Sequence, residues 1–346
     1  MPFYRAAIGP LLALVFFVPA RGDVILSGAG ATFPHPLYRT WFDTFQVQTG
    51  IRISYEPVGS GAGIDQILSQ RVDFGATDAF LADSDLAKVP DRLLHIPTCV
   101  GAVAITYNLP GAPQLQFTPE TVTDIYLGKI THWSDRRLRR INPGVDLPDR
   151  EIVVLHRSES SGTTAILTGY LSAVSSQWRE KVGSGKVVRW PTGMGLEGNP
   201  GIASFVKKIV GSIGYVEMTY AAAHGLPCAA LRNRSGNSIV PTTESVSAAA
   251  AVDIPPDSRC ELTNTPVPDG YPITAFTYIL VYREQAYGGR SRENGEALCK
   301  LLWWMIHAGQ RHTTEMLYAP LPPPAIERAK QTIRTLTYRE EPVACW

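Results

Sequence analysis

The sequence predicts a globular α/β protein, because short β-rich runs alternate with helical patterns along its 346 residues. Apolar residues make up 45% of the chain and charged residues 18%, so the chain can build two lobes with separate cores. The net charge of +1, from 32 basic and 31 acidic residues, lacks the basic surplus of a protein that wraps nucleic acid. The predicted partner is therefore a small molecule or another protein.

The first 22 residues have the layout of a secretory signal peptide. Arg5 precedes an apolar run over residues 6–19, and small residues follow at Ala20 and Gly22. The run is about 14 residues long, whereas a membrane-spanning helix needs roughly 20. We therefore expect cleavage of residues 1–22 and export of a soluble product, in preference to a retained membrane anchor.

After this segment the predicted order is βαβαβ. Leu37, Trp41 and Phe45 recur every four residues and form one apolar helical face, which begins near Pro34 and ends near Gly50. Strands are predicted at residues 24–27, 51–55, 72–76, 100–107, 152–155, 213–216 and 273–282. Helices are predicted at residues 34–50, 64–68, 119–127, 162–174, 201–209 and 293–308.

Two segments, residues 235–271 and 301–306, have unusual compositions. Residues 235–271 are poor in large apolar side chains, which predicts a surface excursion with one alanine-rich helix at residues 244–251. The run LLWWMI at residues 301–306 favours a buried core helix over a lipid-binding patch.

Three glycine- and hydroxyl-rich turns each follow a predicted strand and precede a predicted helix. They are GAGATF at residues 28–33, GSGAG at 59–63 and SSGTT at 160–164. The first N–H groups of a helix lack intrahelical partners and carry the positive end of its dipole, so they bind anions readily. One such turn alone is more often an ordinary helix cap. Three in one chain favour a single anion site.

The sequence offers little evidence for a nucleotide-binding, metal-binding or catalytic site. No Gly-Lys-Ser/Thr occurs, so a nucleotide-phosphate loop is disfavoured, and phenylalanine replaces the third glycine of a dinucleotide fingerprint. The seven histidines are scattered without metal-ligand spacing, so neither a metal nor another cofactor is expected. Ser161 lacks the G-x-S-x-G context of a nucleophile, and His156 is more typical of a surface histidine than of a general base.

The five cysteines are Cys99, Cys228, Cys260, Cys299 and Cys345, and none forms a C-x-x-C pair. An oxidising compartment would allow one or two disulfides and leave at least one thiol over. Cys99 and Cys299 stand in apolar runs and are expected in the core. We predict a bridge between Cys228 and Cys260.

One carboxylate, Asp78, is predicted to lie among these donors. It follows the strand predicted at residues 72–76, where the other turns would converge. A carboxylate beside an anion site is useful when the anion itself carries a proton, as monohydrogen phosphate does and sulfate does not. A site that offers an acceptor to that proton can discriminate by roughly 10⁴ to 10⁵.

At these residues the chain resembles the periplasmic phosphate-binding proteins of bacterial high-affinity phosphate ABC transporters. The resemblance runs in order from about residue 24 to about residue 335. It rests on GAGATFP at 28–34, the Gly59-Ser60 turn, VDFGATD at 72–78, DIYLGKI at 124–130, Arg157 with SGT at 161–163, and IGYVE at 213–217.

This resemblance implies a class II periplasmic binding-protein fold, in which two lobes close over one dehydrated phosphate. It implies a lobe of residues 23–100 plus 275–346, a second lobe of residues 101–274, and two crossing strands. It also implies a periplasmic, monomeric protein that delivers inorganic phosphate to an ABC transporter permease and catalyses no reaction. The ligand contacts that it implies are Thr32, Phe33, Ser60, Asp78, Arg157, Ser161, Gly162 and Thr163.

Two departures from the family pattern stand out. Glu159 replaces the usual aspartate two residues after the arginine, and its longer side chain could still pair with Arg157. Residues 336–346 have no counterpart that the pattern supplies. A binding protein for another oxyanion and a secreted phosphatase are the alternatives. Asp78 argues against the first, and the lack of an evident nucleophile, base or metal set argues against the second.

Overall fold

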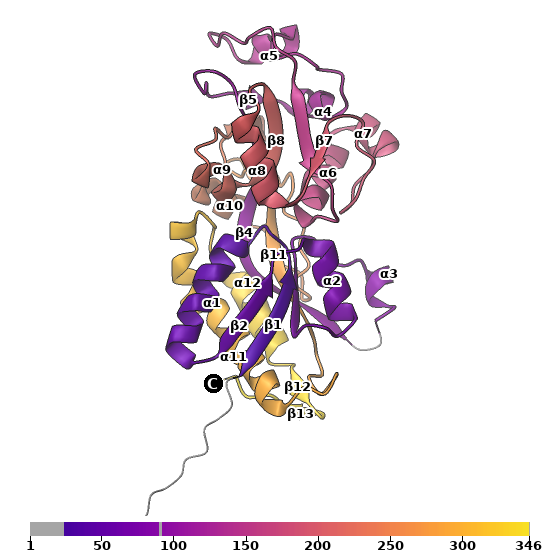
Figure 1. Ribbon diagram of the computed structural model, residues 1–346, viewed down its shortest axis with the longest axis vertical. Coiled ribbons are helices and arrows are strands. Elements are labelled where there is room, and N and C mark those ends of the chain that lie inside the picture. The colour runs from indigo at the N-terminus through magenta and orange to yellow at the C-terminus, as the bar shows by residue number, and fades with distance from the viewer. Residues whose placement is uncertain (1–23, 90–91, 346) are drawn as a thin grey trace, which may run out of the picture.

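The computed structural model describes residues 24–89 and 92–345 (Figure 1). The predicted signal peptide, residues 1–22, lies outside the described residues. Within the described ranges, no helix combines the length and the apolar character that a bilayer crossing requires.

The strands form one eight-stranded sheet in the order β2-β1-β3-β11-β4-β8-β6-β7, which runs through both halves of the molecule. In that order the strands are β2 (Arg52–Glu56), β1 (Ile25–Gly30), β3 (Phe74–Thr77), β11 (Thr274–Tyr282), β4 (Leu93–Tyr107), β8 (Ser212–Glu217), β6 (Val153–Arg157) and β7 (Met194–Leu196). Short strands β10 (Ser238–Ile239), β9 (Ala230–Arg232) and β5 (Gln116–Phe117) form a second sheet, and β12 (Thr337–Tyr338) pairs with β13 (Glu341–Pro342).

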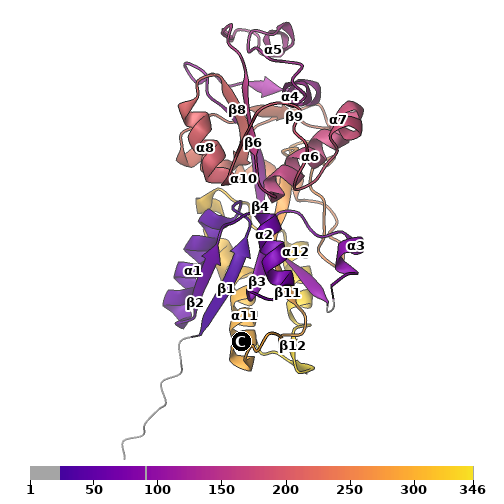
Figure 2. The same cartoon turned by 45° about the vertical axis from the view of Figure 1, so that its right-hand side comes forward.

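Helices cover this sheet in two groups, which define two lobes (Figures 1 and 2). The first lobe contains β1, β2, β3 and β11 with α1 (His35–Thr49), α2 (Ser60–Leu68), α3 (Asp83–Leu86), α11 (Arg292–Met305) and α12 (Pro323–Ile333). The second lobe contains β6, β7 and β8 with α4 (Pro119–Tyr126), α5 (Arg136–Ile141), α6 (Gly162–Val174), α7 (Ser176–Lys181), α8 (Gly198–Lys208), α9 (Met218–Ala223) and α10 (Thr243–Ala249). Two 3₁₀ turns, at Ala308–His312 and Thr314–Met316, precede α12.

Strand β4 connects the two lobes within the sheet. Residues 93–102 pair with β11 of the first lobe, and residues 103–107 pair with β8 of the second. The strand begins earlier than the predicted residue 100, because Pro97 does not end it. The pairing with β11 shifts register between Thr277 and Tyr278, opposite this proline, and such an irregularity tolerates a residue without an N–H donor.

The predicted apolar faces form the core. Leu37, Trp41 and Phe45 of α1 are buried, and Gly50 ends this helix at a φ of 75°, the left-handed conformation that favours glycine. In the run at residues 301–306, Leu301, Leu302, Met305 and Ile306 are fully buried, and the two tryptophans between them are half-buried, which confirms a core helix. The helix in the 235–271 segment is α10, and its Val246 is buried.

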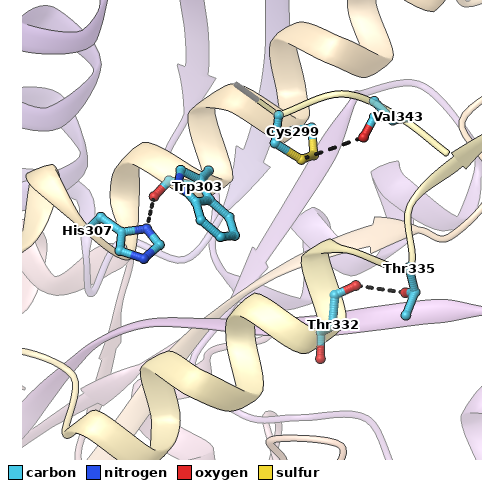
Figure 3. The surroundings of a disulfide bond; sticks show 7 residues. Cys299, Trp303, His307, Thr332, Thr335 and Val343 are labelled. Carbon is cyan, nitrogen blue, oxygen red and sulfur yellow. Dashed lines mark hydrogen bonds between the residues drawn. A yellow bond between two sulfur atoms is a disulfide. The ribbon is translucent and has the colours of Figure 1, made fainter.

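The predicted cysteine pairing is wrong. The disulfide joins Cys299 of α11 to Cys345 of the C-terminal tail, with the Cα atoms 4.9 Å apart (Figure 3). Cys228 and Cys260 are free thiols, and so is the buried Cys99. The observed pairing differs from the prediction because the β12–β13 hairpin brings the C-terminal tail back onto α11, where Val343 and Cys345 are buried. Cys299 is therefore buried as expected, but as half of a bridge.

Replacement of Cys345 by serine should lower the free energy of unfolding by roughly 2–4 kcal/mol, because the bridge closes a loop with a sequence separation of 46 residues. Urea denaturation measures this loss, and Cys260→Ser, which removes a free thiol, is the matched control. Equal stability of Cys345→Ser and the parent chain would show that the tail is held by packing alone.

Candidate functional site

The three predicted anion-binding turns meet between the lobes. The first lies between β1 and α1, the second between β2 and α2, and the third between β6 and α6. The backbone N–H of Gly61 donates to the carbonyl of Ser160 at 3.0 Å, which joins the second turn to the third across the two lobes. Gly59 is the N-cap of α2 and has a φ of 93°, so the backbone there needs glycine. The expected arrangement of strand, turn and helix is confirmed at all three places.

The first lobe contributes one wall of the site. Thr32 and Phe33 precede α1, Ser60 is the first residue of α2, and Asp78 follows β3. The Phe33 ring is fully buried and packs edge-on against Tyr318, so only the backbone of Phe33 is available to a ligand. Ser60 Oγ lies 3.4 Å from Asp78 Oδ2.

The second lobe contributes the opposite wall. Arg157 ends β6, and its side chain is 1% exposed. Ser161 caps α6 by accepting a hydrogen bond from the N–H of Thr164 at 3.2 Å, and Gly162 and Thr163 are the first two residues of the helix. Their N–H groups are among those that no helical carbonyl can reach, so this wall presents donors and one cation.

The two walls are in direct contact, so the structure brings all eight predicted site residues together. Arg157 Nη1 donates to Thr163 Oγ1 at 3.2 Å, and Arg157 Nη2 donates to Thr32 Oγ1 of the first lobe at 3.4 Å. A methyl group added at Gly162 would overlap Ser60 Oγ and Asp78. Cavities of about 470 and 450 Å³ flank this contact, one lined by Asp78 and the other by Thr32.

Glu159 pairs with Arg157, as its reach suggested. Arg157 Nε donates to Glu159 Oε1 at 2.8 Å, Arg157 Nη2 contacts the same oxygen, and the N–H of Gly198 donates to it at 3.1 Å. Burial alone would raise the pKa of Glu159, but the hydrogen bond and charge of Arg157 outweigh burial and lower it. The cation of the site is therefore largely offset by an ionised neighbour.

Asp78 is a buried carboxylate with an unusual titration. Burial raises its pKa to about 7, against the opposing effects of the Thr277 hydrogen bond, the Arg157 charge and the Ser60 hydrogen bond. Thr277 Oγ1 donates to Asp78 Oδ1 at 2.8 Å. The carboxyl group can therefore hold or release a proton near neutral pH, which suits a group that shares a proton with an anion.

Some residues of the site were not found from the sequence. Asn199, at the start of α8, donates to Thr32 Oγ1 at 2.9 Å, and Tyr220 Oη donates to the carbonyl of Thr32 at 2.6 Å. Thr277 comes from β11, almost 200 residues from its partner Asp78. Only the Gly198-Asn199-Pro200 turn carried a usable signal, because it repeats the pattern of a glycine turn between a strand and a helix.

The site offers no cluster for a metal ion. Among residues 24–89 and 92–345, no three histidine, cysteine, aspartate or glutamate side chains gather with the geometry of metal ligands. The arrangement of helix N-termini, hydroxyls, one paired guanidinium and one titratable carboxylate suits a small, protonated oxyanion.

Comparison with known proteins places the chain in a class and then in a family. The model of the PBP superfamily domain matches residues 18–305. The chain is 38% identical to the phosphate-binding protein PstS of Pasteurella multocida, over 99% of both chains. It is 39% identical to PstS of Xylella fastidiosa strain Temecula1, over 88% of this chain and 84% of that protein. The chain therefore belongs to the PBP superfamily and, within it, to the PstS family of phosphate-binding proteins.

The fold agrees with this assignment. The structure of a high-affinity periplasmic phosphate-binding protein, PfluDING, bound with phosphate, superimposes with a TM-score of 0.72. The two chains are 22% identical, and the superposition covers 93% of this chain and 96% of the other. The class II periplasmic binding-protein fold with two lobes, expected from the resemblance, is confirmed.

Proposed function

We propose that the chain binds one inorganic phosphate ion between its lobes, at Thr32, Phe33, Ser60, Asp78, Arg157, Ser161, Gly162 and Thr163. The observation that carries this proposal is the position of Asp78, a buried acceptor among donors. A binding site for a fully deprotonated oxyanion such as sulfate would gain nothing from a carboxylate there, because the two negative charges would repel each other.

Neutral donors, one cation and one carboxylate have different roles in this proposed site. Backbone N–H groups at the starts of α1, α2 and α6 and the hydroxyls of Thr32, Ser60 and Thr163 donate to the phosphate oxygens. Arg157 supplies the single cation, and the carboxylate of Glu159 offsets part of its positive charge. Asp78 accepts a hydrogen bond from the O–H of monohydrogen phosphate. Hydrogen bonds from neutral groups thus stabilise most of the charge of the ligand, which allows tight binding. Release remains possible, because the site comes apart once the lobes open and water returns.

Lobe closure follows from the connections between the lobes. We assign residues 23–100 and 275–346 to the first lobe and residues 101–274 to the second, with β4 and β11 as the crossing strands. The pairing of β4 with β11 up to Ala102 and with β8 from Val103 supports a hinge at this point. Opening there would separate Thr32 from Arg157 and dismantle the site.

The cellular role follows from the family. We propose that residues 1–22 direct export to the periplasm, and that the monomeric chain delivers phosphate there to the permease subunits of an ABC transporter in the inner membrane. No covalent chemistry is part of this role. A turnover assay on a phosphate ester tests this last point, since a rate that Arg157→Ala abolishes would favour a phosphatase instead.

Calorimetry on the chain without residues 1–22 tests the proposed ligand. We expect about one phosphate bound per chain and no measurable binding of sulfate at the same concentrations, because sulfate carries no proton for Asp78. Equal affinities for the two anions would contradict the role of Asp78, and binding of neither would contradict the proposed function as a whole.

Replacement of Gly162 by alanine should prevent closure, because the added methyl group would overlap Ser60 and Asp78 of the other lobe. We expect phosphate affinity to fall by at least about 100-fold and small-angle scattering to show an open molecule at saturating phosphate concentrations for the parent. Gly169→Ala is the matched control on the same helix, since nothing lies within 4 Å of its added methyl group. Parent-like binding by Gly162→Ala would show that the lobes close less tightly than the structure indicates.

A further inference from the structure

A buried asparagine lies between the two walls of the site. Asn199 is the second residue of α8 and is fully buried. Leu196 pairs with Arg157 in the register of β6 and β7, which places the start of α8 beside the guanidinium group. The side chain of Asn199 therefore reaches the first lobe from the second.

The amide of Asn199 has one orientation that satisfies its neighbours. Its Oδ1 accepts a hydrogen bond from the backbone N–H of Glu217 at 2.9 Å. Because a backbone N–H only donates, the atom that faces it must be the oxygen, and the other atom must be the NH₂ group. This NH₂ group donates to Thr32 Oγ1 at 2.9 Å and to Thr163 Oγ1 at 3.3 Å.

These bonds fill the acceptor positions of both threonine hydroxyls. Thr163 Oγ1 accepts from the NH₂ group of Asn199 and from Arg157 Nη1. Thr32 Oγ1 accepts from the NH₂ group of Asn199, from the backbone N–H of Asn199 at 3.4 Å and from Arg157 Nη2. A hydroxyl has two lone pairs and one hydrogen, so each threonine has only its hydrogen left to offer. Within the described part of the chain, neither hydroxyl donates to another protein group.

We propose that Asn199 is a positioning residue that makes the hydroxyls of Thr32 and Thr163 obligate donors toward the bound anion. Thr32 belongs to the first lobe and Thr163 to the second, so Asn199 sets both donors only when the lobes are closed. The inference rests on the proposed phosphate site and deepens it. It assigns to a residue outside the eight contacts part of the preference for a ligand that accepts at these positions.

Replacement of Asn199 by aspartate tests this role. The substitution keeps the shape and the oxygen that faces Glu217, but its second oxygen can only accept at pH 8. The two hydroxyls then donate to the new carboxylate and turn away from the ligand. We expect calorimetry at pH 8 to show at least about 100-fold weaker phosphate binding, from two lost hydrogen bonds to a charged group and from the added negative charge.

Asn142→Asp is the matched control. Asn142 is also buried, accepts from the N–H of Gln116 at 2.8 Å, and donates through its NH₂ group to the carbonyls of Gln116 and Leu138 at 3.1 and 3.0 Å. Asn142→Asp turns a carboxylate oxygen toward two carbonyls that cannot donate, so its cost to folding should be at least as large as that of Asn199→Asp, and thermal unfolding checks this. Asn142→Asp should bind phosphate as tightly as the parent does.

A second substitution separates positioning from a purely structural role. Thr163→Val removes one hydroxyl and should cost the parent roughly 10-fold in phosphate affinity, but almost nothing in the Asn199→Asp background, where that hydroxyl no longer faces the ligand. An unchanged cost of Thr163→Val in that background would overturn the proposal.

If Asn199→Asp fails to fold, Asn199→Ala carries the same comparison, with an expected loss of about 10-fold. A parent that binds phosphate, together with a folded Asn199 variant of equal affinity, would overturn the role of Asn199 alone. A parent that does not bind phosphate would instead overturn the proposed function.

Discussion

Replacing Arg157 with alanine is expected to weaken phosphate binding by roughly 1,000-fold or more. Arg157 is the cation of the site, and it is buried against Thr163, Thr32 and the ionised Glu159. Its removal takes away charge-assisted hydrogen bonds and also leaves the carboxylate of Glu159 facing the anion. Loss of one partner of a buried ion pair typically costs about 2–5 kcal/mol, before any repulsion is counted.

A double variant separates these two effects. Arg157→Ala with Glu159→Gln removes the cation and its counter-charge together, so it should recover part of the lost affinity, by about 10-fold relative to Arg157→Ala alone. Arg137→Ala is the control, because Arg137 is likewise ion-paired, with Asp124 and Asp135, but belongs to α5 at the far end of the second lobe. Calorimetry with phosphate measures all four proteins. Parent-like affinity for Arg157→Ala would exclude it from the site.

Replacing Asp78 with asparagine should erode the discrimination between phosphate and sulfate by several powers of ten. The parent offers an acceptor to the phosphate proton, and the asparagine amide can instead turn an N–H toward an unprotonated oxygen. Phosphate affinity should fall while sulfate affinity rises, so competition between the two anions measures the change. If the ratio of the two affinities stays at the parent value, a group other than Asp78 accepts the hydrogen bond from the phosphate O–H.

Asp78→Asn should weaken phosphate binding, but without ligand it should stabilise the folded chain. Burial raises the pKa of Asp78 from 3.8 to about 7, so the folded state retains a proton that the unfolded state loses. Stability from this group is complete below pH 3.8 and is lost as the pH rises through about 7, a decrease of roughly 2–3 kcal/mol between pH 5 and pH 8. Asp78→Asn should lack this decrease. Urea denaturation at both pH values, without phosphate, should therefore show the largest advantage of the variant at pH 8.

Local patterns predicted the elements whose ends are marked by local chemistry. The helix expected at residues 162–174 is α6 at the same bounds, because Ser161 provides an N-cap that the sequence displays. The first half of β4 was missed, since Pro97 argues against a strand until its bulged pairing with β11 is known. Helix α12 was also missed. Its start at Pro323 lies in a proline run, and proline is accepted in the first turn of a helix.

The same distinction holds for the site. The ligand-facing turns could be predicted because each one combines glycine, hydroxyl residues and a helix start within a few residues. Thr277 could not, because its partner Asp78 lies far away in the sequence. The turn at Gly198-Asn199-Pro200 indicates a helix start, but not that Asn199 meets Thr32 of the other lobe once the lobes have closed. The disulfide failed for the same reason, since the cysteine spacing carries no information about where the tail returns.

A crystal structure of the chain with bound phosphate would locate the ligand and its contacts. We expect one phosphate between the lobes, with a carboxylate oxygen of Asp78 about 2.5–2.7 Å from one phosphate oxygen and the guanidinium group of Arg157 bonded to the others. A phosphate bound elsewhere, such as in the cavity of about 410 Å³ that Arg259 lines, would refute the proposed site between the lobes. A phosphate between the lobes with both Asp78 oxygens beyond hydrogen-bonding distance would contradict the role of Asp78.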